Sequence, residues 1–404
     1  MDMSSHKYSH AQQLNSMCIL AKIIAKEGEI LSNNVYSELK VLDLSDLSAA
    51  YCGKLLAAYG AHVLKIEPPG GERTRYMGPF AGRPADPEKS LLFAYTNCGK
   101  HSAVLDLTAE SDRQKFLTLV LQYDVLIETS TPGTMEALGL DYPSLHAINP
   151  RLIMASVTPF GQTGPHRLWK APTDLILDAM GGPMGNMCLP NRPPLHLGYD
   201  ILGPASSLYV LIAIQAALHR RVRTGKGAYI DMSQQECLIP WKSNMLGDAQ
   251  TLRKDPPVSV SRGLVRCKDG MVFLFIGGKW KALLDWMEET GIDTTVLKDE
   301  QYDCHNYDVL APWDDVLNDK LQEFGRYYTK TELMLQGQLR KIPVGALETA
   351  DTLLENEQLR ERDFFHEIDH PVLGKLTYMG PVAKMSSLEQ DILSRAPLLG
   401  EDQI

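Results

Sequence analysis

The residues with the clearest capacity for chemistry lie in a glycine- and proline-rich loop that spans residues 183–204. Asp200 is the only acidic residue in this loop, and a long apolar segment follows directly after it. The N-terminus of a helix presents free N–H groups and the positive end of a dipole, so a loop that enters a buried helix is a favourable place for a reacting anion. The alternative is a turn that connects two core helices and has no chemical role.

Two helices are predicted to hold this loop in place. Residues 171–182 have apolar side chains at helical spacing and end on Gly181-Gly182, a helix stop signal. Residues 205–221 form an almost continuous apolar run, interrupted by Gln215, which is too short to span a membrane and indicates a buried central helix. Basic residues follow at its C-terminal end, where the helix dipole favours cations.

The composition is that of a soluble globular protein long enough for two domains. The 404 residues are 44% hydrophobic and 22% charged, and 40 Lys and Arg against 50 Asp and Glu give a net charge of −10. This charge argues against general binding to nucleic acid or to an anionic membrane. The seven cysteines are scattered without a CxxC pair, so we expect reduced thiols in the cytoplasm, with no disulfide framework and no metal site.

The chain is expected to contain an extension, two domains and a returning segment. Residues 1–37 are predicted to be an N-terminal extension with a short amphipathic helix near residues 14–26. Residues 38–228 alternate between strand and helix signals, which predicts an α/β domain with a doubly wound, mostly parallel sheet. Residues 229–364 indicate a smaller α+β domain, and residues 365–404 are expected to return to the large domain. No GxGxxG follows the first strand, so a dinucleotide site is not supported.

Five segments, taken in order, resemble the class III coenzyme A transferases, a family that includes formyl-CoA transferase, carnitine CoA transferase and α-methylacyl-CoA racemase. They cover most of the chain from residue 40 onward, and the ordered set is specific although each segment alone is weak. The segments are VLDLSDLSAAYCGKLLAAYGAHVLKIEPPGGERTR, NCGKHSAVLDL, VLIETSTPGTMEALGLDYPSLHAINPRLIMASVTPFGQTGP, LHRRVRTGKGAYIDMS and HPVLGKLTYMGP.

The resemblance implies a Rossmann-like large domain, a small α+β domain and two chains interlocked like rings. It also implies nucleophilic catalysis by a carboxylate. An Asp attacks the acyl-CoA carbonyl, the released CoA thiolate converts the resulting anhydride into an aspartyl-CoA thioester, and the acceptor acid opens this thioester. A glycine-rich loop shields the developing oxyanion. CoA and acyl-CoA are then substrates, and no cofactor is expected to stay bound.

The loop departs from the family pattern at the nucleophile. Aligned forward from Gly181-Gly182 or backward from LHRRVRTGKG, the family's Asp position falls on Gly203. Asp200 lies three residues earlier, which is roughly 10 Å along an extended chain and enough to lose an attack geometry. We therefore expect no catalytic residue in this chain. Asp200 is the fallback if the loop shifts to compensate.

Positions that the family uses for CoA are also altered. Ala137 and Pro68 stand where basic residues are usual, and residues 256–263 replace the glycine-rich loop. Arg73 and Lys100 are further candidates for binding CoA phosphates, with solvated surface charge as the alternative. The CoA-binding residues implied by the resemblance are Ala49, Arg75, Leu105, Thr129, Ser130 and Thr131.

The sequence leaves four functions open. The first is a catalytically silent subunit of a heteromeric class III CoA transferase, with a homologous catalytic chain as its partner. The succinyl-CoA:benzylsuccinate type of anaerobic toluene degradation is such a pair within the family. The others are an active homodimer that uses Asp200, an acyl-CoA racemase and a non-enzymatic scaffold. The racemase is disfavoured because Thr173-Asp174 stands where a His–Asp pair is needed. Four residues of the loop either line a pocket for an apolar acid or simply pack: Met184, Met187, His196 and Tyr199.

Overall fold

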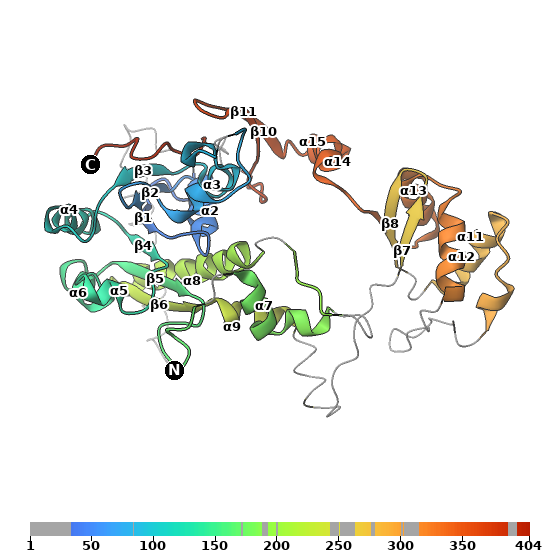
Figure 1. Ribbon diagram of the computed structural model, residues 1–404, viewed down its shortest axis with the longest axis horizontal. Coiled ribbons are helices and arrows are strands. Elements are labelled where there is room, and N and C mark those ends of the chain that lie inside the picture. Colours follow the sequence, from blue (N-terminus) through green and yellow to red (C-terminus); the bar gives the residue numbers. More distant parts are fainter. Residues whose placement is uncertain are drawn as a thin grey trace, which may run out of the picture. The chain divides into compact units, whose positions relative to one another are not determined.

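The computed structural model describes residues 34–83, 85–170, 173–187, 193–198, 201–242, 250, 263–275, 279–299, 302, 315–386 and 394–404. Asp200, Tyr199, the helix expected near residues 14–26 and residues 256–262 lie outside the described residues. The described chain forms two units (Figure 1). One draws on segments 1–171, 200–237 and 366–404, and the other on 172–199 and 238–365. This division differs from the expected boundaries because residues 172–199 group with the second unit.

The first unit is built on a six-stranded parallel sheet with the strand order β3-β2-β1-β4-β5-β6. The strands are β1 (Lys40–Leu44), β2 (His62–Glu67), β3 (His101–Val104), β4 (Val125–Glu128), β5 (Ile153–Thr158) and β6 (Ala228–Ser233). The prediction of a doubly wound, mostly parallel sheet is confirmed. The strand at β6 was expected in the smaller domain, but it pairs with β5 and completes this sheet. The order reverses between β1 and β4, where such sheets bind ligands at their carboxyl edge.

Helices cover both faces of this sheet (Figure 1). On one face, α2 (Ala50–Ala58) and α8 (Leu202–Thr224) enclose a core that includes Val41. On the other face, α4 (Glu110–Val120), α5 (Thr134–Ala137) and α6 (Tyr142–Ile148) enclose a core that includes Leu42. Neighbouring side chains of a strand point to opposite faces, so a strand covered on both sides is apolar throughout. Both Val41 and Leu42 are fully buried for this reason.

The central helix that the sequence predicts is α8. It ends at Gly225, whose left-handed φ of 68° closes the last turn. Its 23 residues are long and apolar enough to cross a membrane by composition, so the expectation that it is too short was wrong. The helix instead packs against α2, β5 and β6, as a core helix does. Near its C-terminus the buried Arg221 pairs with Asp124 at 2.9 Å.

The second unit contains a three-stranded antiparallel sheet and several amphipathic helices. Its strands are β7 (Leu264–Cys267), β8 (Gly270–Leu274) and β9 (Val344–Ala346). Its principal helices are α7 (Asp174–Gly181), α11 (Trp280–Glu289), α12 (Asp315–Gly325) and α13 (Lys330–Arg340). The fully buried Trp286 lies in its main core. β7 and β8 pair as an antiparallel hairpin, and α7 stops at Gly182 with a φ of 101°, as the sequence indicates.

The end of the chain packs against the first unit. The remaining elements are α3 (Leu91–Asn97), α9 (Gln234–Leu238), α14 (Ala350–Glu355), α15 (Glu357–Glu361), β10 (Phe365–His370), β11 (Gly374–Met379) and the short 3-10 turns η1 (Arg73–Tyr76), η2 (Pro87–Lys89), η3 (Pro183–Asn186), η4 (Ile239–Lys242) and η5 (Thr295–Lys298). Tyr378 of β11 packs on Cys98 beside α3. Further along, the N–H of Gly400 donates to Ser102 Oγ at 3.0 Å. These contacts anchor the C-terminal segment beside β3.

Candidate active site at the carboxyl edge of the sheet

Three chain segments meet at the carboxyl edge of the sheet, beside the reversal between β1 and β4. In the loop after β1, the carbonyl of Ser48 accepts a hydrogen bond from Ser206 Oγ of α8 at 2.7 Å. The N–H of Asp46 in the same loop donates to Thr129 Oγ1, just after β4, at 2.9 Å. The start of α8 and the segment after β4 are therefore both tied to the loop after β1.

This junction contains three of the residues predicted from the sequence. Ala49 is fully buried and directly precedes α2. Thr129 is half-buried and accepts the hydrogen bond from Asp46, and Gly203 is buried in the first turn of α8. Asp200 lies outside the described residues. The structure thus brings the expected nucleophile position and two expected CoA-binding residues to one edge of the sheet.

Gly203 packs directly on the backbone of the loop after β1. A Cβ atom added at this position would lie 2.6 Å from the carbonyl oxygen of Leu47. The obstacle is backbone and not the end of a flexible side chain, so any larger residue would force a shift of the helix or of the loop. The position that the family alignment assigns to the nucleophile therefore has no room for a carboxylate in this conformation.

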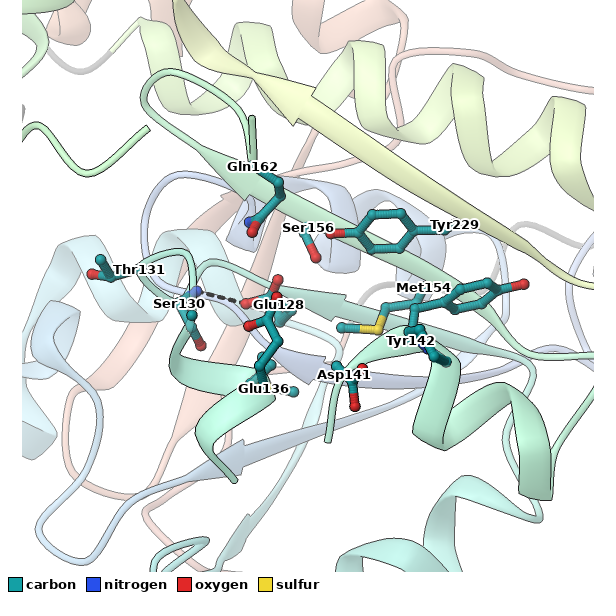
Figure 2. A pocket seen from close by; sticks show the side chains of 13 residues that line it. Glu128, Ser130, Thr131, Glu136, Asp141, Tyr142, Met154, Ser156, Gln162 and Tyr229 are labelled. Carbon is teal, nitrogen blue, oxygen red and sulfur yellow. Dashed lines mark hydrogen bonds between the residues drawn. The ribbon is translucent and has the colours of Figure 1, made fainter. Parts of the chain in front are cut away.

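A pocket of about 280 Å³ lies next to this junction, lined by residues from the end of β4, from within β5 and from the start of β6 (Figure 2). Ser130 and Thr131, both predicted to bind CoA, are among its lining residues. Glu128, at the end of β4, is 1% exposed and accepts a hydrogen bond from the N–H of Ser130 at 2.7 Å. Burial raises the pKa of the Glu128 carboxyl, and hydrogen bonds from Ser156 and Ser130 offset this only in part. Sequence reasoning missed Glu128, although a lone acid that ends an apolar strand was a usable signal.

The character of this pocket is acidic and aromatic. Two further carboxyl groups, Glu136 and Asp141, line it with Glu128, and no Lys or Arg is among its described lining residues. The rings of Tyr142 and Tyr229 stack at a centroid distance of 5.3 Å (Figure 2 shows both). A pocket with three carboxyl groups does not favour a phosphate. Ser130 and Thr131 therefore have no cationic neighbour there that would help them hold the phosphates of CoA.

Arg75, another predicted CoA-binding residue, is fully buried and bound to carboxylates of its own domain. Its Nε and Nη2 atoms donate to the two oxygens of Glu67 at 2.7 and 2.8 Å, and Nη1 donates to Glu88 at 3.1 Å. Nη2 also reaches the carbonyl of Pro397 at 3.2 Å, and the guanidinium lies 3.7 Å from the Phe93 ring centroid. The structure therefore gives Arg75 a role in joining the C-terminal segment to the sheet.

Lys100 is likewise committed within the fold. Its Nζ donates to Asp43 at 2.6 Å and to Asn97 and the Ala50 carbonyl at 2.8 Å each, which uses all three of its hydrogen atoms. Burial opposes the charge of Asp43, but Lys100 and the neighbouring Lys65 outweigh it and hold the pKa of Asp43 below its ordinary value. Lys100 therefore has no remaining donor for a phosphate in this conformation.

The other positions singled out by the sequence divide into buried and exposed residues. Leu105 is 2% exposed in the core between the sheet and α4, and its N–H donates to the carbonyl of Glu67 at 3.0 Å. Ala137, Pro68 and Arg73 are exposed. Of the three cations named as candidates for CoA phosphates, Arg73 is the one on the surface, whereas Arg75 and Lys100 are buried.

A histidine–carboxylate pair lies in the second unit, within the loop region that leads toward α8. His196 Nδ1 and Asp178 Oδ2 are 3.1 Å apart, and the N–H of Leu197 donates to the same oxygen at 3.1 Å. The sequence singled out His196 but missed Asp178. Asp178 lies 18 positions earlier, within a helix whose spacing signalled only its apolar face. Among the described residues no group of three or more His, Cys, Asp or Glu side chains could hold a metal ion.

Residues 36–403 match CoA-transferase family III. The chain belongs to this family. It is 28% identical over 380 residues to the BbsE subunit of succinyl-CoA:(R)-benzylsuccinate CoA-transferase from Thauera aromatica, a match that covers 91% of this chain and 92% of the relative. It is 29% identical over 382 residues to succinyl-CoA:mesaconate CoA-transferase from Haloarcula marismortui, covering 90% and 93% of the two chains. The crystal structure of a CAIB/BAIF family protein from Brucella suis superimposes with a TM-score of 0.80 at 29% identity, covering 92% and 97%.

The family resemblance drawn from the sequence is thus confirmed. The function of the chain lies in CoA transfer of the class III type, with CoA thioesters as substrates. The observed large α/β unit with its parallel sheet and the smaller antiparallel sheet agree with the architecture that the resemblance implied.

Proposed function

We propose that this chain is the non-catalytic subunit of a heteromeric class III CoA transferase. A homologous partner chain supplies the nucleophilic Asp and most of the CoA-binding cations. The complex moves CoA from an acyl-CoA donor such as succinyl-CoA to a carboxylic acid, with benzylsuccinate as the candidate acceptor. The packing of Gly203 carries this proposal.

The main support for this proposal is that the nucleophile position has no space for a side chain. An Asp in this family must reach the acyl carbonyl to form the mixed anhydride, so its side chain needs open space in front of the central helix. In this chain the equivalent position is Gly203, and the Leu47 carbonyl would stand 2.6 Å from its Cβ. The substitution and the packing agree with each other, because the loop after β1 occupies the space that a side chain would need.

The surroundings support weak binding of CoA by this chain alone. Arg75 and Lys100 direct their hydrogen bonds to groups of their own domain, and position 137 carries an alanine where a basic residue is usual. Each charge-assisted contact to a phosphate contributes about 1.5–3 kcal/mol. The loss of two such contacts weakens binding by roughly two decades or more, so we expect the partner chain to bind most of the CoA.

The relatives support both a subunit role and a substrate class. The relative from Thauera aromatica is named as a subunit of its transferase, and both curated relatives are named for succinyl-CoA. Succinate, mesaconate and benzylsuccinate are dicarboxylic acids, and their CoA thioesters keep one free carboxylate. We assign substrates of this class to the complex. A cytoplasmic location is included in the proposal and is supported by four described cysteines that are buried and unpaired.

Purification of the native complex tests the proposal. A tag on this chain should retain a second, homologous chain in equal amount, and the pair should have transferase activity with succinyl-CoA. The chain produced alone should be inactive. An active assembly that contains only copies of this chain would refute the proposal and restore the homodimer.

A further inference from the structure

The pocket beside the junction is a concave site that the proposed transfer chemistry does not use. All of its lining residues belong to the first unit, and its volume of about 280 Å³ is near the lower end of the range for small-molecule sites. Glu128 lies deep in it with 1% of its surface exposed, whereas Glu136 and Thr131 are exposed (Figure 2). The pocket therefore connects a buried carboxyl group with the surface.

The carboxyl groups of this pocket give it a negative charge. Glu128, Glu136 and Asp141 line it, and no Lys, Arg or His is among its described lining residues. Burial, assisted by the charge of Glu136, raises the pKa of Glu128. A cation placed next to Glu128 and Glu136 would offset both the repulsion between them and the cost of burying a carboxylate.

Two basic side chains lie near the aromatic wall but outside the pocket. Arg220 acts electrostatically on Tyr142, and its Nη1 donates to the carbonyl of Gly227 at 3.1 Å. His146 Nδ1 lies 3.2 Å from the hydroxyl of Tyr142. Neither side chain lines the pocket, so the carboxyl groups inside it have no cationic partner among the described lining residues.

The arrangement of the carboxyl groups favours an organic cation over a metal ion. Among the described residues no group of three or more His, Cys, Asp or Glu side chains could hold a metal ion. The three acids instead come from different places around the cavity, since Glu128 ends β4, Glu136 lies on α5 and Asp141 directly precedes α6. Acceptors spread in this way match a cation with several N–H donors that point in different directions.

The aromatic wall of the pocket indicates a flat cation. The rings of Tyr142 and Tyr229 stack at a centroid distance of 5.3 Å with an interplanar angle of 25°, so they form a nearly continuous surface (Figure 2). A guanidinium group is planar, stacks on aromatic faces and carries five N–H donors, whereas an ammonium is a compact point charge. Met135 and Met154 also line the pocket and provide adaptable apolar contact for a short hydrocarbon chain.

We propose that this pocket binds a small guanidinium compound. The guanidinium group stacks on the surface formed by Tyr142 and Tyr229 and donates to Glu128 and Glu136, while its hydrocarbon chain contacts the two methionines. The ligand belongs to a second class of small molecule, distinct from CoA thioesters, whose phosphates the same carboxyl groups repel. The inference goes beyond the proposed function and does not depend on which chain carries the nucleophile.

Isothermal titration calorimetry of the native assembly, purified through a tag on this chain, tests the proposal with two probes of similar shape. Butylguanidinium carries the positive charge, and butylurea is planar but neutral. We expect butylguanidinium to bind at least tenfold more tightly than butylurea. Glu136→Gln should weaken butylguanidinium roughly tenfold, the loss of one charge-assisted hydrogen bond, and leave butylurea unchanged. Tyr229→Leu should weaken butylguanidinium roughly two- to fivefold, the loss of one aromatic face.

Glu38→Gln is the matched control, because Glu38 is an exposed acid of the same unit that does not line the pocket. This variant should bind both probes as the wild type does. Equal weakening of butylguanidinium in Glu38→Gln and Glu136→Gln would indicate attraction to the overall charge and overturn the inference. Unchanged binding in Glu136→Gln would overturn it as well.

The wild type alone supplies two more decisive results. Failure of butylguanidinium to bind, or binding no tighter than that of butylurea, would refute a cation site. Butylammonium bound as tightly as butylguanidinium would refute the assignment to a planar cation. All of these outcomes concern binding, so they are separate from a failure of the silent-subunit proposal, which appears as activity in an assembly made only of this chain.

Discussion

Replacement of Arg75 by methionine should destabilise the chain strongly without acting through CoA. Arg75 is fully buried and makes four hydrogen bonds, two of them to Glu67. Removal of one member of a buried ion pair costs about 3–5 kcal/mol because the other charge stays behind without a partner. Glu67 keeps its bond from Ser102 Oγ at 2.7 Å, which places the expected loss near the lower end, about 3 kcal/mol.

Urea unfolding of the purified complex measures this loss. With a slope of about 3 kcal/mol per molar urea, the first transition should shift down by roughly 1 M. Arg73→Met is the matched control, because Arg73 lies in the same short turn but is exposed, and its substitution should shift the midpoint little. Adding Glu67→Gln to Arg75→Met should recover a large part of the stability, since the stranded charge is then removed.

The dependence of this effect on pH follows from the pKa of Glu67. Burial would raise this pKa, but the hydrogen bonds and charge of Arg75 outweigh it and hold it below the ordinary value of 4.5. Because the pKa of Glu67 is lowered in the folded state, its ionised carboxylate stabilises the fold fully above about pH 4.5. This contribution is lost as pH falls through the pKa that Glu67 has in the folded state. The difference between wild type and Arg75→Met should therefore shrink below pH 4.5. A variant with unchanged stability but much weaker CoA binding would refute this reasoning and make Arg75 a phosphate ligand.

Three further substitutions have expected outcomes that the structure sets. Gly203→Ala should lower stability by about 1–3 kcal/mol because its Cβ meets backbone, whereas Gly185→Ala, with nothing within 4 Å of its Cβ, should be nearly neutral in the same unfolding assay. Glu128→Gln should stabilise the protein at neutral pH. The raised pKa of Glu128 means that its contribution is present at low pH and lost as pH rises, so the advantage of Gln should disappear near pH 4. Hydrogen bonds from Arg395 lower the pKa of Glu401 to about 2. Hydrogen exchange should therefore show that the protection of residues 394–404 is lost as pH falls from 4.5 toward 2. Glu401→Gln should lack this protection already at pH 7.

The sequence predicted the strands and major helices of the sheet because their signals are local. Apolar runs such as IMASVT in β5 and the glycines that end α7 and α8 can be recognised within a few residues. It missed α3 and α6, which are seven residues each and have short, weak patterns. It also placed β6 in the smaller domain. This last parallel strand lies directly before the segments of the second unit in the sequence, and only its pairing with β5 shows that it belongs to the large sheet.

The site was harder to predict because its decisive contacts join residues far apart in the sequence. Alignment with the family assigned Gly203 to the nucleophile position, but only the structure shows the Leu47 carbonyl against it. Arg75 was assigned to CoA from its position in a motif, and its partner Pro397 is 322 residues away. The sequence shows which residues are charged, but it does not show which of them are buried against partners in the fold. Buried cations therefore could not be distinguished from exposed ones.

Covalent trapping tests the central claim, that this chain lacks the nucleophile, most directly. The native complex is incubated with succinyl-CoA, treated with hydroxylamine or borohydride, which attack aspartyl-CoA thioesters, and digested for mass spectrometry. We predict a modified Asp on the partner chain and an unmodified peptide around Asp200, with Asp200→Asn keeping turnover of the complex within a few-fold of wild type. A modified peptide that contains Asp200, together with a loss of several decades of activity in Asp200→Asn, would contradict the account.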